Sequence, residues 1–351
     1  MGTKDIRIQL NTWLRKIPTT LKNVSNEPLA MQTPFGKQNS LSELFDELPH
    51  TDDERTLVIC QARNEGNGED FCLSLQHEGR VFFGAFDGCG GSGARVYPSF
   101  GGHTGAWVAS RAASVAAREW FLEKEADEAF TAHVDRALQA CRGQEPGGQT
   151  LMGSLSREFP TTVAAFVKDA DSPEVTFFWC GDSRCYILDA DGLHQITPDD
   201  TNIKDAMCNL REDAPMTNVA CASRPFEVHC AKLRIEKPSL IFAATDGCFG
   251  YLPSPMSFER LLLDTMGHAT DMRNWKKKLD RQFSTVSGDD YTLVALMQGF
   301  GSFREMKQTL TVRFADLDAQ YPADTTGEDA LFAQWEQYRA GYESMMIDLS
   351  A

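Results

Sequence analysis

Two aspartate–glycine pairs, each at the end of an apolar run, are the residues of this chain best suited to chemistry. Asp87-Gly88 ends the run 81–86, and Asp246-Gly247 ends the run 240–245. Such a run is typical of a buried strand, so each pair predicts a carboxylate at an exposed strand end. The glycine lets the backbone turn and brings a carbonyl oxygen close to whatever the aspartate holds. Oxygen donors of this kind bind hard divalent cations.

A tight hairpin turn is the alternative interpretation, because Asp-Gly is also the strongest hairpin dipeptide. The chain contains such a case in Asp191-Gly192, which lies between two short strands with polar flanks. The runs before Asp87 and Asp246 are instead apolar enough to be buried on both faces. An uncompensated carboxylate is costly there, so a bound cation is the economical partner.

Three further acidic positions share this context of an acid at a strand terminus with a glycine beside it or two residues away. Asp70 directly precedes the expected strand that pairs with the one ending at Asp87. Asp182 follows Gly181 between two strands, and Asp289 follows Gly288 just before the last core strand. Taken singly, each acid is typical of an ordinary turn. Taken together, they predict a cluster of carboxylates.

The elements that must position these acids can be placed from the hydrophobic pattern. Strands are expected at 57–62, 71–76, 81–86, 162–167, 175–180, 185–188, 228–235, 240–245 and 291–298. Helices are expected at 103–125, 128–141, 257–266 and 271–286. Because strands and helices are grouped, the pattern favours an α+β layered architecture over a parallel doubly wound sheet.

Three regions follow from this pattern: an N-terminal helical extension (1–50), a central domain (51–300) and a C-terminal helical extension (301–351). The last helix is expected to open with a capping box from Thr325 to Glu328. One face of it is apolar and comprises Leu331, Phe332, Trp335, Tyr338, Tyr342 and Met345. We expect this face to pack on the body of the protein, with docking of a partner as the alternative.

Composition and charge indicate which partners and which cellular compartment to expect. The 351 residues carry a formal net charge of −16 and show no basic stripe, which argues against nucleic acid as a partner. The ten cysteines are scattered without a C-x-x-C pair, as in reduced intracellular proteins. No long apolar stretch predicts a signal peptide or a membrane span, so we expect a cytoplasmic protein that does not enter a membrane.

In their order along the chain, these motifs resemble the metal-dependent serine/threonine phosphatases of the protein phosphatase 2C family, bacterial type. The resemblance covers about residues 55–300. The matching pieces are Arg63, Glu69-Asp70, Phe86-Asp87-Gly88, Gly90-Gly91, Thr161-Thr162, Gly181-Asp182-Ser183-Arg184, Ala244-Thr245-Asp246-Gly247 and Asp289-Asp290-Tyr291-Thr292.

The resemblance implies a four-layer αββα sandwich, in which two antiparallel sheets are flanked by helices and metals bind at one edge. It implies two Mg²⁺ or Mn²⁺ ions and a third, weakly bound one. Asp87 would bridge the two ions, and the Gly88 carbonyl, Asp70, Asp246 and Asp289 would complete the shell. Asp182 would support the third ion, and Arg63 would hold the substrate phosphate. The implied reaction is hydrolysis of phosphoserine or phosphothreonine in a phosphoprotein substrate by attack of a metal-bridging water.

The chain departs from the family pattern beside the expected site. Cys89 stands where animal members carry histidine, and we interpret it as a small filler rather than a redox group. The loop Ser92–Gly102 is an insertion that could gate the site, and the expected substrate-contacting flap, residues 199–224, is short. The alternative function is a catalytically silent module that binds phosphoproteins or a partner. Every expected ligand position is acidic, which favours hydrolysis.

Overall fold

The computed structural model describes residues 53–144, 157–212 and 214–348. Contacts divide the chain into residues 1–37 and a compact unit from residue 38 to the end. The expected N-terminal extension, residues 1–50, lies outside the described residues. None of the helices in the described ranges is long and apolar enough to cross a membrane.

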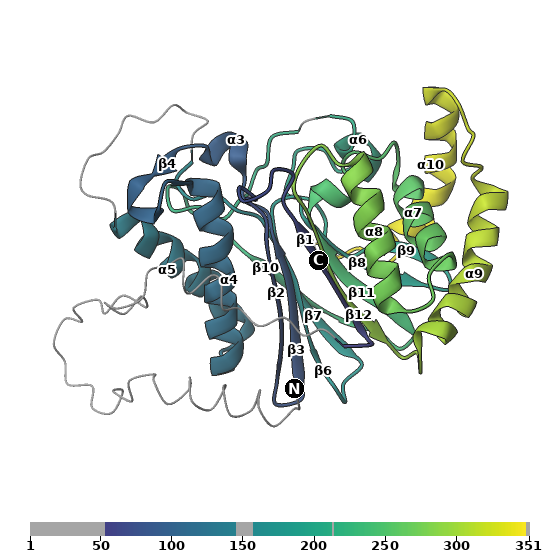
Figure 1. Ribbon diagram of the computed structural model, residues 1–351, viewed down its shortest axis with the longest axis horizontal. Coiled ribbons are helices and arrows are strands. Elements are labelled where there is room, and N and C mark those ends of the chain that lie inside the picture. Colours follow the sequence, from purple (N-terminus) through teal and green to yellow (C-terminus); the bar gives the residue numbers. More distant parts are fainter. Residues whose placement is uncertain (1–52, 145–156, 213, 349–351) are drawn as a thin grey trace. The chain divides into compact units, whose positions relative to one another are not determined.

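Two five-stranded antiparallel sheets form the centre of the described unit (Figure 1). Sheet A has the order β1 (Thr56–Gln61), β12 (Tyr291–Gln298), β11 (Ser239–Ala244), β8 (Arg184–Asp189) and β9 (Gly192–Gln195). Sheet B has the order β10 (His229–Arg234), β7 (Glu174–Cys180), β6 (Val163–Asp169), β3 (Arg80–Phe86) and β2 (Phe71–His77). The β3 and β11 runs are almost entirely buried, as expected for strands covered on both faces.

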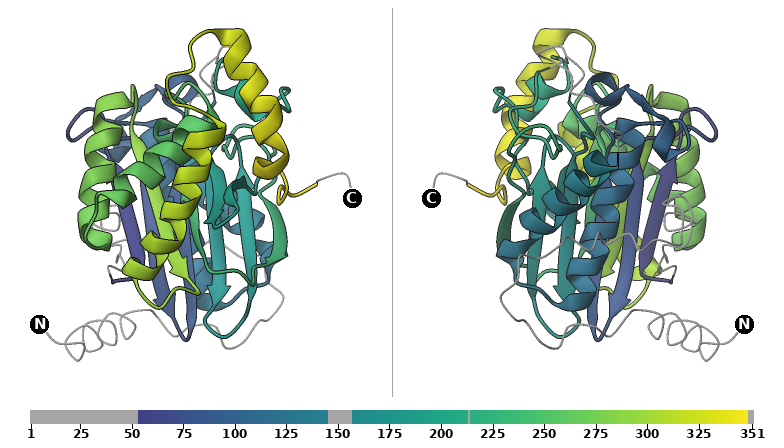
Figure 2. Two further views of the ribbon diagram at one scale, coloured as in Figure 1. Left: turned by 90° about the vertical axis from the view of Figure 1, so that its right-hand side faces the viewer. Right: turned by 90° about the vertical axis from the view of Figure 1, so that its left-hand side faces the viewer.

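Helices cover the outer face of each sheet. α4 (Gly105–Glu123) and α5 (Phe130–Gly143) pack on sheet B, whereas α7 (Pro255–Gly267), α8 (Met272–Val286), α9 (Phe303–Gln320) and α10 (Glu328–Tyr342) lie on the side of sheet A (Figure 2). Two short helices, α3 (Gly90–Gly93) and α6 (Ala206–Asn209), lie in connections. One apolar cluster fills each sheet–helix interface, and a third joins the two sheets. The expected αββα sandwich is confirmed.

Every strand and helix expected between residues 51 and 300 is present, with ends within two residues of the prediction. The hairpin at Asp191-Gly192 is also confirmed, because β8 and β9 pair with Asp189 opposite Gly192. The sequence missed the two-residue strands β4 (Val96–Tyr97) and β5 (His103–Thr104). Strands this short carry too few residues for a periodic pattern.

The last helix differs from the prediction in how it begins. α10 begins at Glu328, its N-cap is Gly327, and no side chain caps it. The expected capping box is therefore wrong. Gly327 has a φ of 95°, a left-handed conformation that interrupts any helix with Thr325 as its N-cap, three residues before Glu328. Thr325 instead donates a hydrogen bond to the Pro322 carbonyl at 2.9 Å.

The apolar face of α10 packs on the body of the protein, as predicted. Trp335, Tyr338 and Tyr342 are buried in the same cluster as the helix-covered face of sheet A. Leu331 and Phe332 are partly buried against that cluster. The C-terminal helices therefore share a core with sheet A within the described part of the chain.

Candidate active site

Antiparallel pairing brings Asp70 and Asp87 to the same end of sheet B. β2 begins at Phe71 directly opposite Phe86, the last residue of β3. The acid before β2 and the acid after β3 are therefore neighbours. This confirms the expected pairing of the two strands.

Sheet A gathers the other three acids in the same way. The end of β11 at Ala244 lies opposite Leu293 near the start of β12 and opposite Arg184 at the start of β8. Asp246 therefore follows one strand where Asp289 and Asp182 precede its two neighbours.

Hydroxyl groups join these two strand ends across the sandwich. Thr245 Oγ1 of sheet A donates to Asp70 Oδ2 at 2.8 Å and accepts from the Thr292 backbone N–H at 2.9 Å. Thr162 Oγ1 and Ser183 Oγ form a second bridge of 2.7 Å between the sheets. Sequence reasoning assigned no role to Thr245, although it lies directly before Asp246 in a quoted motif.

Burial and the neighbouring acids raise the pKa of Asp87, Asp182 and Asp246. Burial, followed by the nearby charges of the other four acids, raises the pKa of Asp87 well above its usual range. Burial and then Asp246 raise the pKa of Asp182 to about 7, and burial and then Asp289 raise the pKa of Asp246 to about 6. Like charges gathered in this way call for a positive partner. The donors are all oxygen, which suits Mg²⁺ or Mn²⁺.

The described side chains do not form a complete set of metal ligands. Within the described ranges, no group of three or more His, Cys, Asp or Glu side chains is arranged to hold a metal ion. The acids therefore fit divalent cations by type and by shared location. The ligand assignments to Asp70, Asp87, Gly88, Asp182, Asp246 and Asp289 stay predictions.

The backbone of Asp87 is held firmly. Its carbonyl accepts from Thr161 Oγ1 and from the Thr162 backbone N–H, both at 2.8 Å, and its N–H donates to Thr162 Oγ1 at 3.2 Å. Gly88 is confined as well, because a Cβ there would lie 2.5 Å from the Ala106 carbonyl oxygen. The threonine pair thus fixes the direction in which the Asp87 carboxylate leaves the strand.

The two adjacent acids before β12 have different environments. The Asp290 carboxylate accepts from the backbone N–H groups of Arg63 and Glu69, both at 2.6 Å, and so holds the loop between β1 and β2. Asp289 is exposed, and its Oδ1 accepts from the neighbouring Asp290 N–H at 2.8 Å. This division favours Asp289 over Asp290 as a ligand.

Arg63 lies beside this loop and is exposed. Its Nη1 donates to the carbonyl of Ser287, two residues before Asp289. The structure therefore brings Arg63 to the acidic strand ends.

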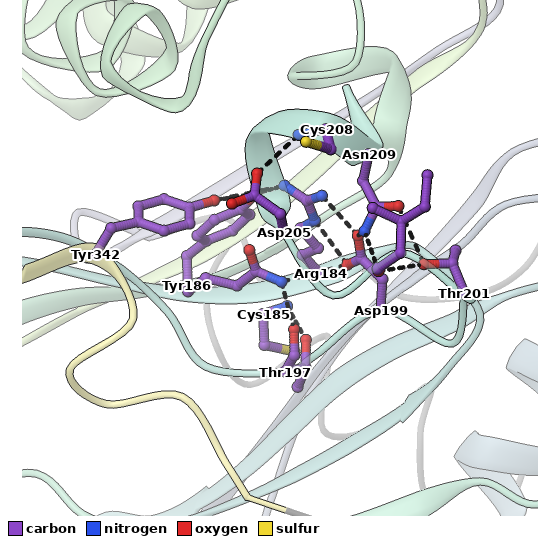
Figure 3. A network of polar contacts seen from close by, with 12 residues as sticks. Arg184, Cys185, Tyr186, Thr197, Asp199, Thr201, Asp205, Cys208, Asn209 and Tyr342 are labelled. Atoms are coloured by element: carbon purple, nitrogen blue, oxygen red, sulfur yellow. Dashed lines mark hydrogen bonds and ion pairs between the residues drawn. The ribbon is translucent and has the colours of Figure 1, made fainter. Parts of the chain in front are cut away.

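A cavity of about 330 Å³ adjoins the acids Asp182 and Asp246. Its wall includes Arg184, Asp199, Thr201, Asn209, Leu210, Arg211, Glu212, Ala214, Phe249, Gly250 and Tyr251. The guanidinium of Arg184 binds both carboxylate oxygens of Asp199, at 2.8 and 2.6 Å, and both side chains are buried (Figure 3). Such a pair is rigid because two parallel bonds fix its geometry. Asp199 is the first residue of the expected flap, which therefore forms one wall of this cavity.

Cys89 and the loop Ser92–Gly102, the two departures from the family pattern, both have a defined environment in the structure. Burial and then Asp87 raise the pKa of the Cys89 thiol well above its usual range, which disfavours the reactive thiolate. Within the loop Ser92–Gly102, Tyr97 and Phe100 are buried, and the Tyr97 ring stacks on Phe159 at 4.5 Å. The gating role of this loop stays a prediction.

The Thr245 bridge supports a prediction about stability. Thr245→Val keeps the shape of the side chain but leaves the buried Asp70 carboxylate and the Thr292 N–H without this partner. We expect the free energy of unfolding to fall by about 1–3 kcal/mol. Urea denaturation of the metal-free protein measures this, with the exposed Ser284→Ala variant as control. A loss no larger than that of the control would show that the bridge adds nothing.

Comparison with known proteins agrees with this geometry. The family model of protein phosphatase 2C matches residues 61–284. The serine/threonine phosphatase Stp1 from Staphylococcus aureus has a TM-score of 0.55 at 14% identity, covering 72% of this chain and 98% of that chain. A bacterial serine phosphatase has a TM-score of 0.53 at 16% identity, covering 71% and 99%. No curated protein sequence matches the chain. Because the family model spans more than half of the chain and these structures share its two-sheet fold, the chain belongs to the protein phosphatase 2C family.

Proposed function

We propose that the protein hydrolyses phosphoserine and phosphothreonine in proteins with two Mg²⁺ or Mn²⁺ ions, and that a third ion binds weakly. The observation that carries the proposal is the gathering of five acids, from separate strand ends, at one end of the sandwich. In a member of this family, such a cluster supports a hydrolase rather than a silent binding module.

Each residue has a proposed role. Asp87 would bridge the two ions, with Gly88, Asp70, Asp246 and Asp289 as further ligands and Asp182 for the third ion. When bound, paired divalent ions activate a water for attack and neutralise phosphate charge. The guanidinium of Arg63 would donate to phosphate oxygens, for which its planar fork is suited. Thr161 and Thr162 hold the Asp87 backbone so that its carboxylate keeps one direction.

Chelation tests the metal requirement directly. Purified protein should hydrolyse a generic phosphomonoester when Mn²⁺ or Mg²⁺ is added, and excess chelator should abolish the activity. Restoring the metal should restore turnover. Activity that persists in excess chelator would rule out the two-metal mechanism. A folded protein that binds a phosphopeptide but never hydrolyses it would support the silent module instead.

Arg63→Ala tests phosphate binding. We expect the Michaelis constant for phosphate esters to rise by roughly 10- to 150-fold, because a charge-assisted hydrogen bond of about 1.5–3 kcal/mol is lost, at about 1.4 kcal/mol for each factor of ten. Metal affinity, measured by calorimetry, should be nearly unchanged, and Arg63→Lys should recover part of the loss. If metal affinity falls together with substrate affinity, Arg63 acts through its bond to the Ser287 carbonyl and orients Asp289.

A further inference from the structure

The C-terminal helix α10 contacts the flap through one carboxylate. Asp205 Oδ1 accepts from the Cys208 backbone N–H at 2.9 Å and caps the short helix α6. Asp205 Oδ2 accepts from Trp335 Nε1 at 3.0 Å and from Arg339 Nη1 at 2.9 Å. The side chain that orders α6 is therefore held from the other side by two donors of α10. This helix lies outside the residues matched by the family model.

Contacts with α10 continue at Arg211, two residues beyond the C-terminal end of α6. The Arg211 guanidinium lies 5.4 Å from the centre of the Phe332 ring, and its Nη2 is 3.5 Å from Glu328 Oε1. Within α6, the side chain of Met207 is fully buried in the apolar cluster that contains Trp335. The N-cap of α6, its inner face and Arg211 beyond its C-terminal end are thus held by α10 or by its core.

A third link runs from the end of α10 to the cavity wall. The Tyr342 hydroxyl accepts from Arg184 Nη1 at 3.4 Å, and Arg184 holds Asp199 (Figure 3). Asn209 of α6 donates to the same Asp199 carboxylate at 2.9 Å. The part of the flap that lines the cavity is therefore connected to α10 both through Asp205 and through Asp199.

We propose that α10 is the positioning element of the flap and sets how tightly a phosphopeptide binds. The proposal rests on the proposed phosphatase function, because a peptide that places its phosphate at the acidic cluster extends over the adjoining cavity. Trp335 and Arg339 are positioning residues that act through Asp205. A small phosphate ester reaches the acidic cluster without using the cavity wall, so its turnover depends less on α10.

Arg339→Ala and Trp335→Phe test the proposal. Arg339→Ala should raise the Michaelis constant for a phosphopeptide by about tenfold, as expected when a charge-assisted hydrogen bond is lost. The kcat for a small aryl phosphate should stay within about twofold of wild type. Arg339→Lys should restore part of the peptide affinity. Trp335→Phe removes the indole donor but keeps an aromatic ring in the core, and it should act in the same direction.

Gln337→Ala is the control, because Gln337 is an exposed residue of the same helix α10. It should leave the phosphopeptide Michaelis constant unchanged. Hydrogen exchange of residues 199–211, measured without substrate, should accelerate in Arg339→Ala and stay at the wild-type rate in Gln337→Ala.

Two results would overturn the proposal. Unchanged flap exchange and peptide affinity in Arg339→Ala would show that α10 does not position the flap. Equal effects in Arg339→Ala and Gln337→Ala would show a general loss of helix stability. If the wild-type protein hydrolyses no phosphate ester, the proposed function fails. In that case, hydrogen exchange of the flap and calorimetric affinity for a phosphopeptide, compared between wild type and Arg339→Ala, still test whether α10 positions the flap.

Discussion

Asp87→Asn is expected to lower phosphatase turnover by about a thousandfold or more, whereas Asp182→Asn should cost far less. Asp87 is central to the acidic cluster, since the charges of all four other acids add to burial in raising its pKa. Its backbone is also held by three hydrogen bonds from a threonine pair. A ligand in that position sets the spacing of two ions, and several kcal/mol of barrier lowering depend on it, at about 1.4 kcal/mol for each factor of ten.

The measurement is kcat/KM for a phosphate ester at saturating Mn²⁺. Asp191→Asn is the matched control, because Asp191 belongs to the β8–β9 hairpin and pairs with the exposed Lys237. In metal-free protein, Asp87→Asn should be at least as stable as wild type, since removing one of several like charges relieves repulsion. Equal losses of activity in folded Asp87→Asn and Asp182→Asn proteins would contradict the bridging assignment.

The strands were predictable because the burial of their side chains follows the pattern of apolar and polar residues along each strand. β11 is buried along its whole length, and β10 alternates between half-buried and exposed residues, so both carry a signal that local sequence reveals. The start of α10 was not predictable in this way. The Thr-x-x-Glu spacing is present, but the left-handed conformation of Gly327 places the helix start after it.

The acidic positions were predictable because each lies at a strand end, and antiparallel pairing then determines which ends meet. The division of roles between Asp289 and Asp290 was not, because it depends on which carboxylate the loop amides reach. The bond between Asp205 and Trp335 was also hidden, since it joins residues 130 positions apart and leaves no local pattern. Contacts of this kind are defined only by the tertiary structure.

Arg313→Met is expected to lower the free energy of unfolding by about 3–5 kcal/mol, because it leaves a buried carboxylate without its charged partner. Glu259 of α7 is fully buried, and its two oxygens accept from Arg313 of α9 at 2.6 and 2.9 Å. The hydroxyl of Tyr338, on α10, donates to the same carboxylate at 2.7 Å. One carboxylate therefore joins three helices on the side of sheet A.

Guanidinium denaturation measures this loss, and Arg234→Met is the control. Arg234 pairs with Glu236 on the surface, where such a pair contributes about 0–1 kcal/mol. The double variant Glu259→Leu/Arg313→Met removes both charges and should recover most of the stability, apart from about 1–3 kcal/mol for the unpaired Tyr338 hydroxyl.

An Arg313→Met loss no larger than that of the control would mean that Glu259 is adequately solvated without Arg313. A large loss that the double variant recovers would show that the cost comes from the unpaired charge. Because Tyr338 lies three residues from Trp335 on α10, the same anchor would then help to hold the helix that contacts the flap.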